Sequence, residues 1–269
     1  MLNQLRKSRF DNNTWLQIDF NFNNEYLKLL DYRKIFMYSI DFDKLIEEIP
    51  EIRISKNFLY DEHPSYRPHS YKCSIEKVEK ILFLNNWKRG NDGIYYKNNK
   101  PLKFNLVTFE NVDFLNIIVE SLIKQLLNVG IILSVEKVSS DILFSEIYSH
   151  GEDNSFDLLL HAWSGNPFFE KGEMYASRIN SFDNIPSKNN NYKGGNISLF
   201  CNNKYDKLFN KLNEEKNMKY REIILEEMSN LFNKEIIALP LGYKSRNIYK
   251  SHQVAIKSNA FLGNYTNNL

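Results

Sequence analysis

The sequence WSGNPFFE, which begins at Trp163, combines side chains that suit the binding of a small molecule. Trp163 and Phe168 offer flat apolar surfaces, and Gly165 leaves backbone groups accessible in a turn. Ser164 and Asn166 supply hydrogen bonds without charge. The segment follows a predicted strand, and ligands of open α/β sheets bind beyond the carboxyl ends of strands. We predict that these five residues contact a ligand; the alternative is that Trp163 only fills the core.

The histidines and cysteines predict neither a metal site nor a redox site. His63 and His69 are six residues apart in a predicted loop, unlike the paired histidines of a helical zinc motif. His161 lies in the strand before the candidate segment, where packing is the expected role and ligand binding the alternative. Cys73 and Cys201 lack the spacing of a metal knuckle. We expect two isolated thiols, with a disulfide left open, and no cofactor.

Signatures of catalysis and of nucleic-acid binding are absent from the sequence. It contains no nucleophile elbow, phosphate loop or dinucleotide fingerprint, and its carboxylates form no acid–base pair. The 35 Lys and Arg residues nearly balance 33 Asp and Glu residues and are spread along the chain. Nucleic-acid binding requires a concentrated basic face. We expect a protein that is not an enzyme and does not bind nucleic acid.

The elements that must position the candidate segment have an α/β order. Alternation predicts a strand over 102–109, apolar spacing predicts a helix over 112–128, and a second strand follows over 131–138. Short links make this a right-handed βαβ unit with parallel strands. A third strand over 156–163 leads into the candidate segment.

Further elements surround this unit. The predicted strands and helices are a strand over 15–22, helices over 31–40 and 42–49, a helix after Ser74 with Ile75, Val78 and Leu82 on one face, a short helix over 141–150, helices near 203–215 and 218–236, and a strand over 237–248 interrupted by Pro240. We expect 51–73 and 181–198 to be surface loops, the second one mobile.

The length and the polarity of the chain set limits on its class. The 269 residues suffice for one large domain or two small ones. No run of about 18 apolar residues predicts a transmembrane helix. The first ten residues are polar and lack the apolar core of a signal peptide, which by itself predicts a cytoplasmic protein.

Six short motifs, in order along most of the chain, resemble those of the family 5 extracellular solute-binding proteins, the oligopeptide, dipeptide and nickel importer group. The helix with Arg33, Ile40 and Asp41 resembles the family's R-x-A-x-x-x-A-I-D segment, with Ile35 and Ser39 at the alanine positions. The other motifs follow in the family's order: the helix from Ser74 to Asn86-Trp87, then Val129-Gly130-Ile131, Ser155-Phe156-Asp157-Leu158 with Trp163, Tyr205-Asp206-Lys207-Leu208, and Ile237 to Tyr243.

The resemblance implies a fold and a set of partners. It implies the C-terminal lobe of a two-lobed, class II periplasmic-binding-protein-like α/β fold over residues 1–250, with the N-terminal lobe missing. Residues 251–269 would be a tail that returns to that lobe. Such proteins close two lobes over a ligand and deliver it to ABC permease subunits in the cell envelope. The chain would then be a fragment, the product of a split gene, or a half that pairs with a separately encoded N-terminal half.

The ligand class stays open at this point. The candidate segment resembles W-x-x-D-Y-x-x-P of the peptide binders, where the Asp pairs with the peptide's α-ammonium, but Asn166 replaces that Asp. It also resembles W-G-x-P-Y-D-P of the nickel binders, with Phe168 in place of Tyr. A small peptide or a nickel or other metal chelate is therefore expected. The alternative function is the ligand-sensing domain of a cytosolic transcription regulator, although no basic helix-turn-helix is present.

Overall fold

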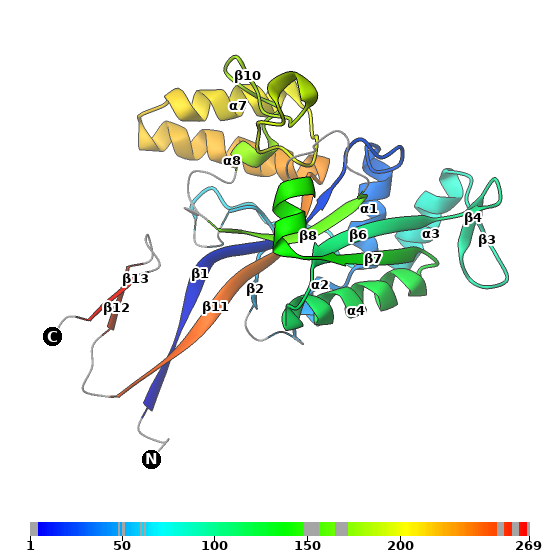
Figure 1. Ribbon diagram of the computed structural model, residues 1–269, viewed down its shortest axis with the longest axis horizontal. Coiled ribbons are helices and arrows are strands. Elements are labelled where there is room, and N and C mark those ends of the chain that lie inside the picture. Colours follow the sequence, from blue (N-terminus) through cyan, green and yellow to red (C-terminus); the bar gives the residue numbers. More distant parts are fainter. Residues whose placement is uncertain are drawn as a thin grey trace.

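The computed structural model describes most of the chain, namely residues 5–47, 49, 52–59, 61, 63–147, 156–164, 172–251, 256–259 and 264–267. A six-stranded mixed sheet forms its centre (Figure 1). The strands lie in the order β2 (Ile52–Ile54), β11 (Ala238–Ser251), β1 (Leu5–Phe20), β8 (Leu158–Ser164), β6 (Lys103–Phe109) and β7 (Ile132–Val138). β6 is parallel to β7 and β8, whereas β1 is antiparallel to β8 and β11.

The predicted βαβ unit is present as β6, α4 (Asp113–Asn128) and β7. Apolar spacing places six residues on the inner face of the helix. Five of them are buried, namely Leu115, Ile118, Val119, Leu122 and Leu126, and Ile123 is partly buried against the core. Gly130 follows the helix with a positive φ of 78°. A Cβ atom added there would lie 2.5 Å from the carbonyl oxygen of Gly93, so the turn requires glycine.

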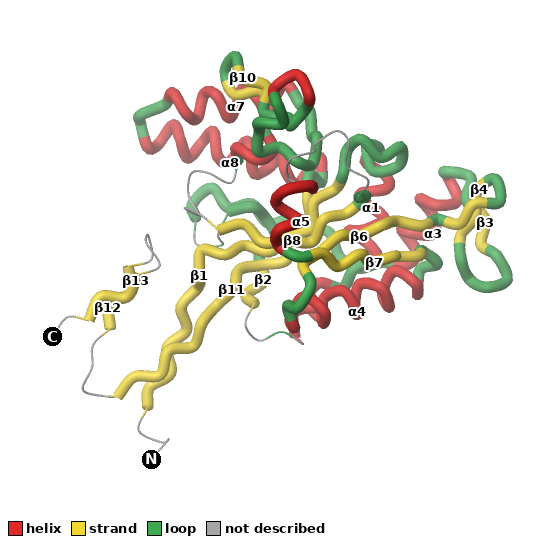
Figure 2. Tube along the Cα trace, viewed as in Figure 1, coloured by secondary structure: helices red, strands yellow, loops and turns green. Residues whose placement is uncertain are grey.

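Alternation along β1 divides the sheet into two faces. Leu16, Ile18 and Phe20 belong to a first apolar core that includes residues of α1 (Leu30–Ser39), α2 (Phe42–Glu47), α3 (Ile75–Leu84) and α4. Trp15 belongs to a second core, with α7 (Asn203–Glu214) and α8 (Met218–Glu235). In Figure 2 the α7–α8 pair lies at the top of the view and α4 at the bottom, with the strands between them. We call these two sides of the sheet the first face and the second face.

Arg33, the arginine of the first motif, is a buried anchor. Its side chain is 3% exposed and donates hydrogen bonds to the backbone oxygens of Leu27, Glu235 and Ile236, at distances of 2.7–3.1 Å. The guanidinium also lies 4.6 Å from the ring centroid of Phe22. Burial lowers the pKa of Arg33 to about 10. This residue therefore joins α1 to the end of α8 and has a structural role.

Strand β1 begins at Leu5, well before the strand predicted over 15–22. Its residues 5–11 pair with residues 245–251 of β11, and the two strands continue as a ribbon beyond the rest of the sheet (Figure 1, blue and orange). The partners are more than 200 residues apart in sequence, so local periodicity does not reveal this pairing. Pro240, the predicted interruption, lies beside an irregularity in the β1–β11 register, a position that tolerates proline.

The predictions of surface loops over 51–73 and 181–198 are only partly correct. The 51–73 stretch contains β2, which pairs with residues 242–244 of β11. The 181–198 stretch is not simply a surface loop, because Asn184 and Asn196 are buried and donate to backbone oxygens. Short polar side chains replace regular backbone ladders there. The stretch includes β10 (Phe182–Asp183), which pairs with β9 (Arg178–Ile179), and the 3-10 turn η5 (Lys188–Asn190).

Other helix predictions need smaller corrections. Ser74 caps α3 as expected by accepting from the Lys77 backbone, but Ile75 is 43% exposed because it lies in the first turn, away from the core. The helix predicted over 141–150 becomes α5 (Ser140–Ile142) and the π-helical turn η2 (Leu143–Ile147), and the remainder lies outside the described residues.

Two small sheets complete the fold. One consists of β3 (Lys88–Arg89), β4 (Tyr95–Lys97) and β5 (Lys100–Pro101), and the other of β12 (Ile256–Asn259) and β13 (Asn264–Asn267). Cys73 and Cys201 are both free and exposed, so the disulfide left open by the sequence is not formed. Within the described part of the chain, no helix is both long and apolar enough to cross a membrane.

Candidate ligand-binding site

Strand β8 brings the candidate segment to the carboxyl edge of the sheet. Trp163 and Ser164 are the last residues of β8, and their backbones pair with Trp15 and Thr14 of β1. Because β8 is parallel to β6, this end lies at the same edge as Phe109, the end of β6. The rest of the predicted set, Gly165, Asn166 and Phe168, lies outside the described residues. Ligand contact by the five residues stays a prediction.

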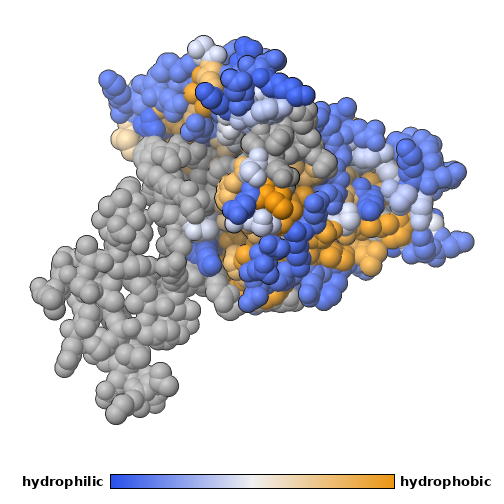
Figure 3. Space-filling view, viewed as in Figure 1, coloured by the Kyte–Doolittle hydropathy of each residue, from blue (hydrophilic) through white to orange (hydrophobic). Residues whose placement is uncertain are grey.

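Exposed apolar side chains surround this edge. Phe144, in η2, is 59% exposed, and its ring centroid lies 6.1 Å from that of Phe109. Ile142, in α5, is 41% exposed. Figure 3 shows apolar residues gathered on this side of the molecule near α5 and over α4. The carboxyl edge therefore offers exposed apolar surface next to Phe109.

A buried polar network lies on the second face, directly before the candidate segment. It joins Gln17 and Asp19 of β1, His161 of β8 and Tyr175 of the 3-10 turn η4 (Glu173–Tyr175). His161 Nε2 lies 2.6 Å from Asp19 Oδ2, and Gln17 Nε2 donates to Asp19 Oδ1 over 2.7 Å. The Tyr175 hydroxyl donates to Gln17 Oε1 over 2.9 Å and lies 3.2 Å from Asp19 Oδ1.

The network surrounds one carboxylate with donors. Asp19 is 1% exposed and His161 is fully buried, and a buried carboxylate requires such hydrogen bonds. The pKa of the Tyr175 hydroxyl is raised well above its ordinary value, first by burial and second by the charge of Asp19. Tyr175 therefore stays a neutral donor, and Gln17 is oriented by its two partners.

His161 is packed, as the sequence predicts, but it is also part of this network. Gln17, Asp19 and Tyr175 are not among the residues that the sequence predicted for a site. The available signal was the alternation in β1, which places Gln17 and Asp19 on one side and Leu16 and Ile18 on the other. A polar strand side usually faces water, so only the packing of η4 and the α7–α8 pair on this face reveals that it is buried.

The other histidines form no joint site. His63 accepts from the Ser65 backbone, and burial lowers its pKa. His69 is 8% exposed, and its ring lies near Phe42 and Tyr71. Burial is the main cause that lowers the pKa of His69 to about 4. Among the residues the structure describes, no cluster of three or more His, Cys, Asp or Glu side chains could hold a metal ion.

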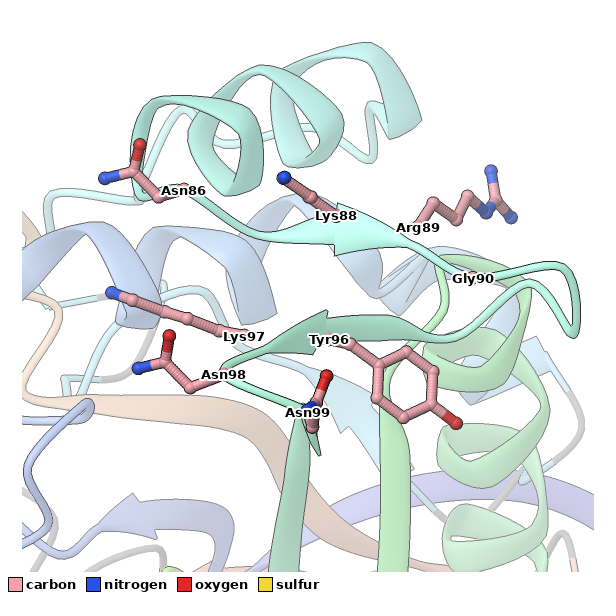
Figure 4. Close-up of a pocket in the computed structure, with 8 residues that line it drawn as sticks. All are labelled: Asn86, Lys88, Arg89, Gly90, Tyr96, Lys97, Asn98 and Asn99. Atoms are coloured by element: carbon pink, nitrogen blue, oxygen red, sulfur yellow. The ribbon is translucent and has the colours of Figure 1, made fainter.

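A hollow of about 500 Å³ lies elsewhere, on the small β3–β4–β5 sheet (Figure 4). Its lining residues are Asn86, Lys88, Arg89, Gly90, Tyr96, Lys97, Asn98 and Asn99. Strand β5 directly precedes β6, so the hollow is near the amino end of the parallel strands. Arg89 is already paired with Glu79, at 3.2 Å. The hollow is thus separate from the predicted ligand segment.

Comparison with protein families identifies the chain. Residues 2–184 match the family described as bacterial extracellular solute-binding proteins, family 5 middle. The chain belongs to this family. The motifs around Arg33, Trp87, Gly130 and Asp157 lie within the matched region. A comparison with curated protein sequences gave no match.

Several solved structures share this fold. The oligopeptide-binding protein of Thermus thermophilus, in complex with a pentapeptide, has a TM-score of 0.82 at 19% identity over 97% of this chain and 47% of that protein. AppA of Bacillus subtilis, the oligopeptide-binding protein with a nonapeptide, has 0.78 at 18%, over 97% and 51%. NikZ of Campylobacter jejuni, with Ni(L-His), has 0.74 at 18%, over 94% and 49%.

These comparisons confirm the expected fold class. Nearly all of this chain, including its mixed sheet, matches periplasmic-binding-protein folds. The chain spans about half the length of these solved relatives, which agrees with one lobe of a two-lobed family 5 protein. The family is one of solute-binding proteins.

Proposed function

We propose that this chain is the ligand-binding half of a receptor that captures a small solute for an ABC importer. The family match over residues 2–184 carries the proposal. Solved relatives include oligopeptide-binding proteins and a protein in complex with Ni(L-His). ABC permease subunits in the cell envelope would be the receiving partner. No observation favours the transcription-regulator alternative.

Trp163, Ser164, Gly165, Asn166 and Phe168 are proposed as the ligand contacts. The position of Trp163 at the carboxyl edge of the sheet supports this choice. An amide at position 166 offers hydrogen bonds but no charge to a peptide's ammonium group. We therefore propose an oligopeptide whose ammonium group is held elsewhere, or a nickel chelate, as the solute.

A second lobe is proposed to complete the cleft. The β1–β11 ribbon, from Leu5 paired with Ser251, reaches beyond the body of this lobe and would connect to it (Figure 1). The tail 251–269, which contains the β12–β13 hairpin, would pack on that second lobe. A separately encoded N-terminal half is one source of it. A single lobe supplies only part of the ligand contacts, so affinity without the other lobe should be low.

Calorimetry with a pentapeptide and with the nickel–histidine complex tests the proposal. The chain alone should bind one of these probes with a dissociation constant of about 1 mM, and a supplied second lobe should tighten binding strongly. Phe144→Ala should weaken binding because Phe144 lies at the carboxyl edge. Phe83→Ala is the matched control, since Phe83 is 76% exposed on α3.

Three results would contradict the proposal. Submicromolar binding by the chain alone would refute the need for a second lobe. Equal effects of the Phe144 and Phe83 variants would refute the location of the site. If neither probe binds even with both lobes present, the proposed solute class is wrong.

A further inference from the structure

The buried network holds both flanks of the candidate segment at one point of β1. His161 lies on β8, which leads into the segment, and Tyr175 lies on η4, which follows the segment in sequence. Both reach Asp19, at 2.6 Å and 3.2 Å. Gln17 Nε2 also lies 3.4 Å from His161 Nε2, and the Gln17 side chain contacts Tyr175 and Met174 of η4. The two flanks are thus joined through side chains of a strand that belongs to neither.

Among the residues that the structure describes, the apolar clusters do not join β8 to η4. Tyr175 packs on Phe232 of α8 and Tyr205 of α7, at ring-centroid distances of 5.4 and 6.4 Å, which fixes η4 to the second-face helices. Leu159 of β8 belongs to a separate apolar cluster with Val107. The polar network lies between these two clusters. Among the described residues, the network joins β8 and η4 through hydrogen-bonding partners that they share on β1.

Stability alone is a weak reason for such a network. Buried charged groups lose hydration, and apolar replacements of similar size are often at least as stable. A buried polar group can instead fix one arrangement of its neighbours. In the β1–β8 register Gln17 lies opposite His161, so the network also selects this register.

We infer that Asp19 is a positioning residue of the ligand site, which holds β8 through His161 and η4 through Tyr175 in the arrangement that binds solute. The inference rests on the proposed function for its link to binding. Asp19 acts through its partners and, being buried, does not touch the solute in this arrangement. The geometry assigns the contact to His161 Nε2, and a glutamine amide nitrogen can reach a similar position.

Hydrogen exchange of the full, unliganded chain tests the positioning role. His161→Leu removes the donor to Asp19, and exchange of 158–164 and 172–176 should accelerate about tenfold relative to 103–109 in β6. His161→Gln keeps a donor and should stay close to the unmodified chain. Tyr175→Phe removes only the second link and should accelerate 172–176 alone. Asp206→Asn is the control, because Asp206 is a buried carboxylate outside the network that holds Ser177 to α7. Exchange of 158–164 in β8 should not change in this variant.

The outcomes separate positioning from general stability. Equal acceleration of β6, β8 and η4 in His161→Leu, or no acceleration, would overturn the inference. So would a His161→Gln variant that behaves as His161→Leu. If His161→Leu does not fold, the Gln and Tyr175→Phe variants decide, since rescue by Gln and selective release of 172–176 are still required.

Binding measurements connect this role to the proposed function. With a second lobe supplied, His161→Leu should weaken binding of the pentapeptide or nickel–histidine probe about tenfold, whereas His161→Gln should not. Unchanged binding in His161→Leu would overturn the link between Asp19 and the ligand site. Failure of the unmodified protein to bind either probe would count against the proposed function alone, because the exchange results do not depend on a ligand.

Discussion

The two faces of strand β1 are buried to the same degree but in different ways. On the first face, Leu16, Ile18 and Phe20 pack among apolar side chains of four helices. On the second face, Gln17 and Asp19 are equally inaccessible but depend on hydrogen bonds from residues more than 140 positions away. Apolar packing accepts many partners, whereas a buried carboxylate requires particular donors at particular positions.

This difference relates to function. The first face holds the lobe together and carries no predicted ligand contact. On the second face, His161 ties the network to β8, which ends at the carboxyl edge where the candidate segment begins. The network there is a costlier way to bury a surface than apolar packing. We expect variants on the first face to change stability most, and variants on the second face to change the arrangement of β8 and η4.

The largest stability effect should come from the first face. Leu122 is 1% exposed at the centre of α4, and Leu122→Ala removes buried methyl groups and leaves a cavity. We expect a loss of about 2–5 kcal/mol in the free energy of unfolding. The shift of the urea midpoint measures it. Leu127→Ala is the matched control, because Leu127 is 53% exposed on the same helix, and its midpoint should hardly change. Equal shifts would refute this packing of α4.

The first face was the part of the fold that the sequence predicted well. Helix α4 and strands β6 and β7 follow from apolar spacing, because the face of the element on which each residue lies depends only on the local periodicity of the sequence. The motif around Arg33 marks a position but does not reveal its partners at the end of α8. The early start of β1 and the Asp19 network depend on pairing between distant segments, which no local pattern contains. The sequence predicted the strand that leads to Trp163 and the packing of His161, but not the residues that hold His161. Ligand contact by Trp163 stays a prediction.

The turn after α4 should show the next effect. Gly130→Ala combines a positive φ of 78° with a Cβ atom 2.5 Å from the Gly93 carbonyl oxygen. We expect a loss of about 2–3 kcal/mol in the free energy of unfolding, because backbone strain and a steric contact add. Gly93→Ala is the control, since Gly93 has a φ of 83° but nothing within 4 Å of the added Cβ. It should lose only about 1 kcal/mol. Equal losses in the two variants would mean that the loop relaxes around an alanine at position 130. The first face would then tolerate an added methyl group better than its close packing suggests.

Two buried histidines sharpen the comparison between the faces. His161 has Asp19 as a partner on the second face, whereas His69 packs beside Phe42 and Tyr71, which belong to the first core or pack against it. Neither ring nitrogen of His69 has a hydrogen-bond partner among the described residues. Charging His69 in the fold is unfavourable, mainly because of burial and second because of Lys56, with Asp43 acting in the opposite direction.

The smallest predicted effect is therefore a pH dependence that His69 introduces. Its pKa is about 4 in the folded chain and 6.5 ordinarily, so the unfolded chain binds the extra proton between these values. Stability is fully present above pH 6.5 and is lost as the pH falls toward 4, by on the order of 1–3 kcal/mol from this residue. His69→Phe removes the titration and fits the aromatic surroundings. Urea midpoints at pH 7, 6 and 5 should therefore fall less in the variant than in the unmodified chain. If the urea midpoints of both proteins fall in parallel with pH, His69 must gain water or a partner when it is charged. The first face would then tolerate a lone histidine without the hydrogen-bond donors that Asp19 needs on the second face.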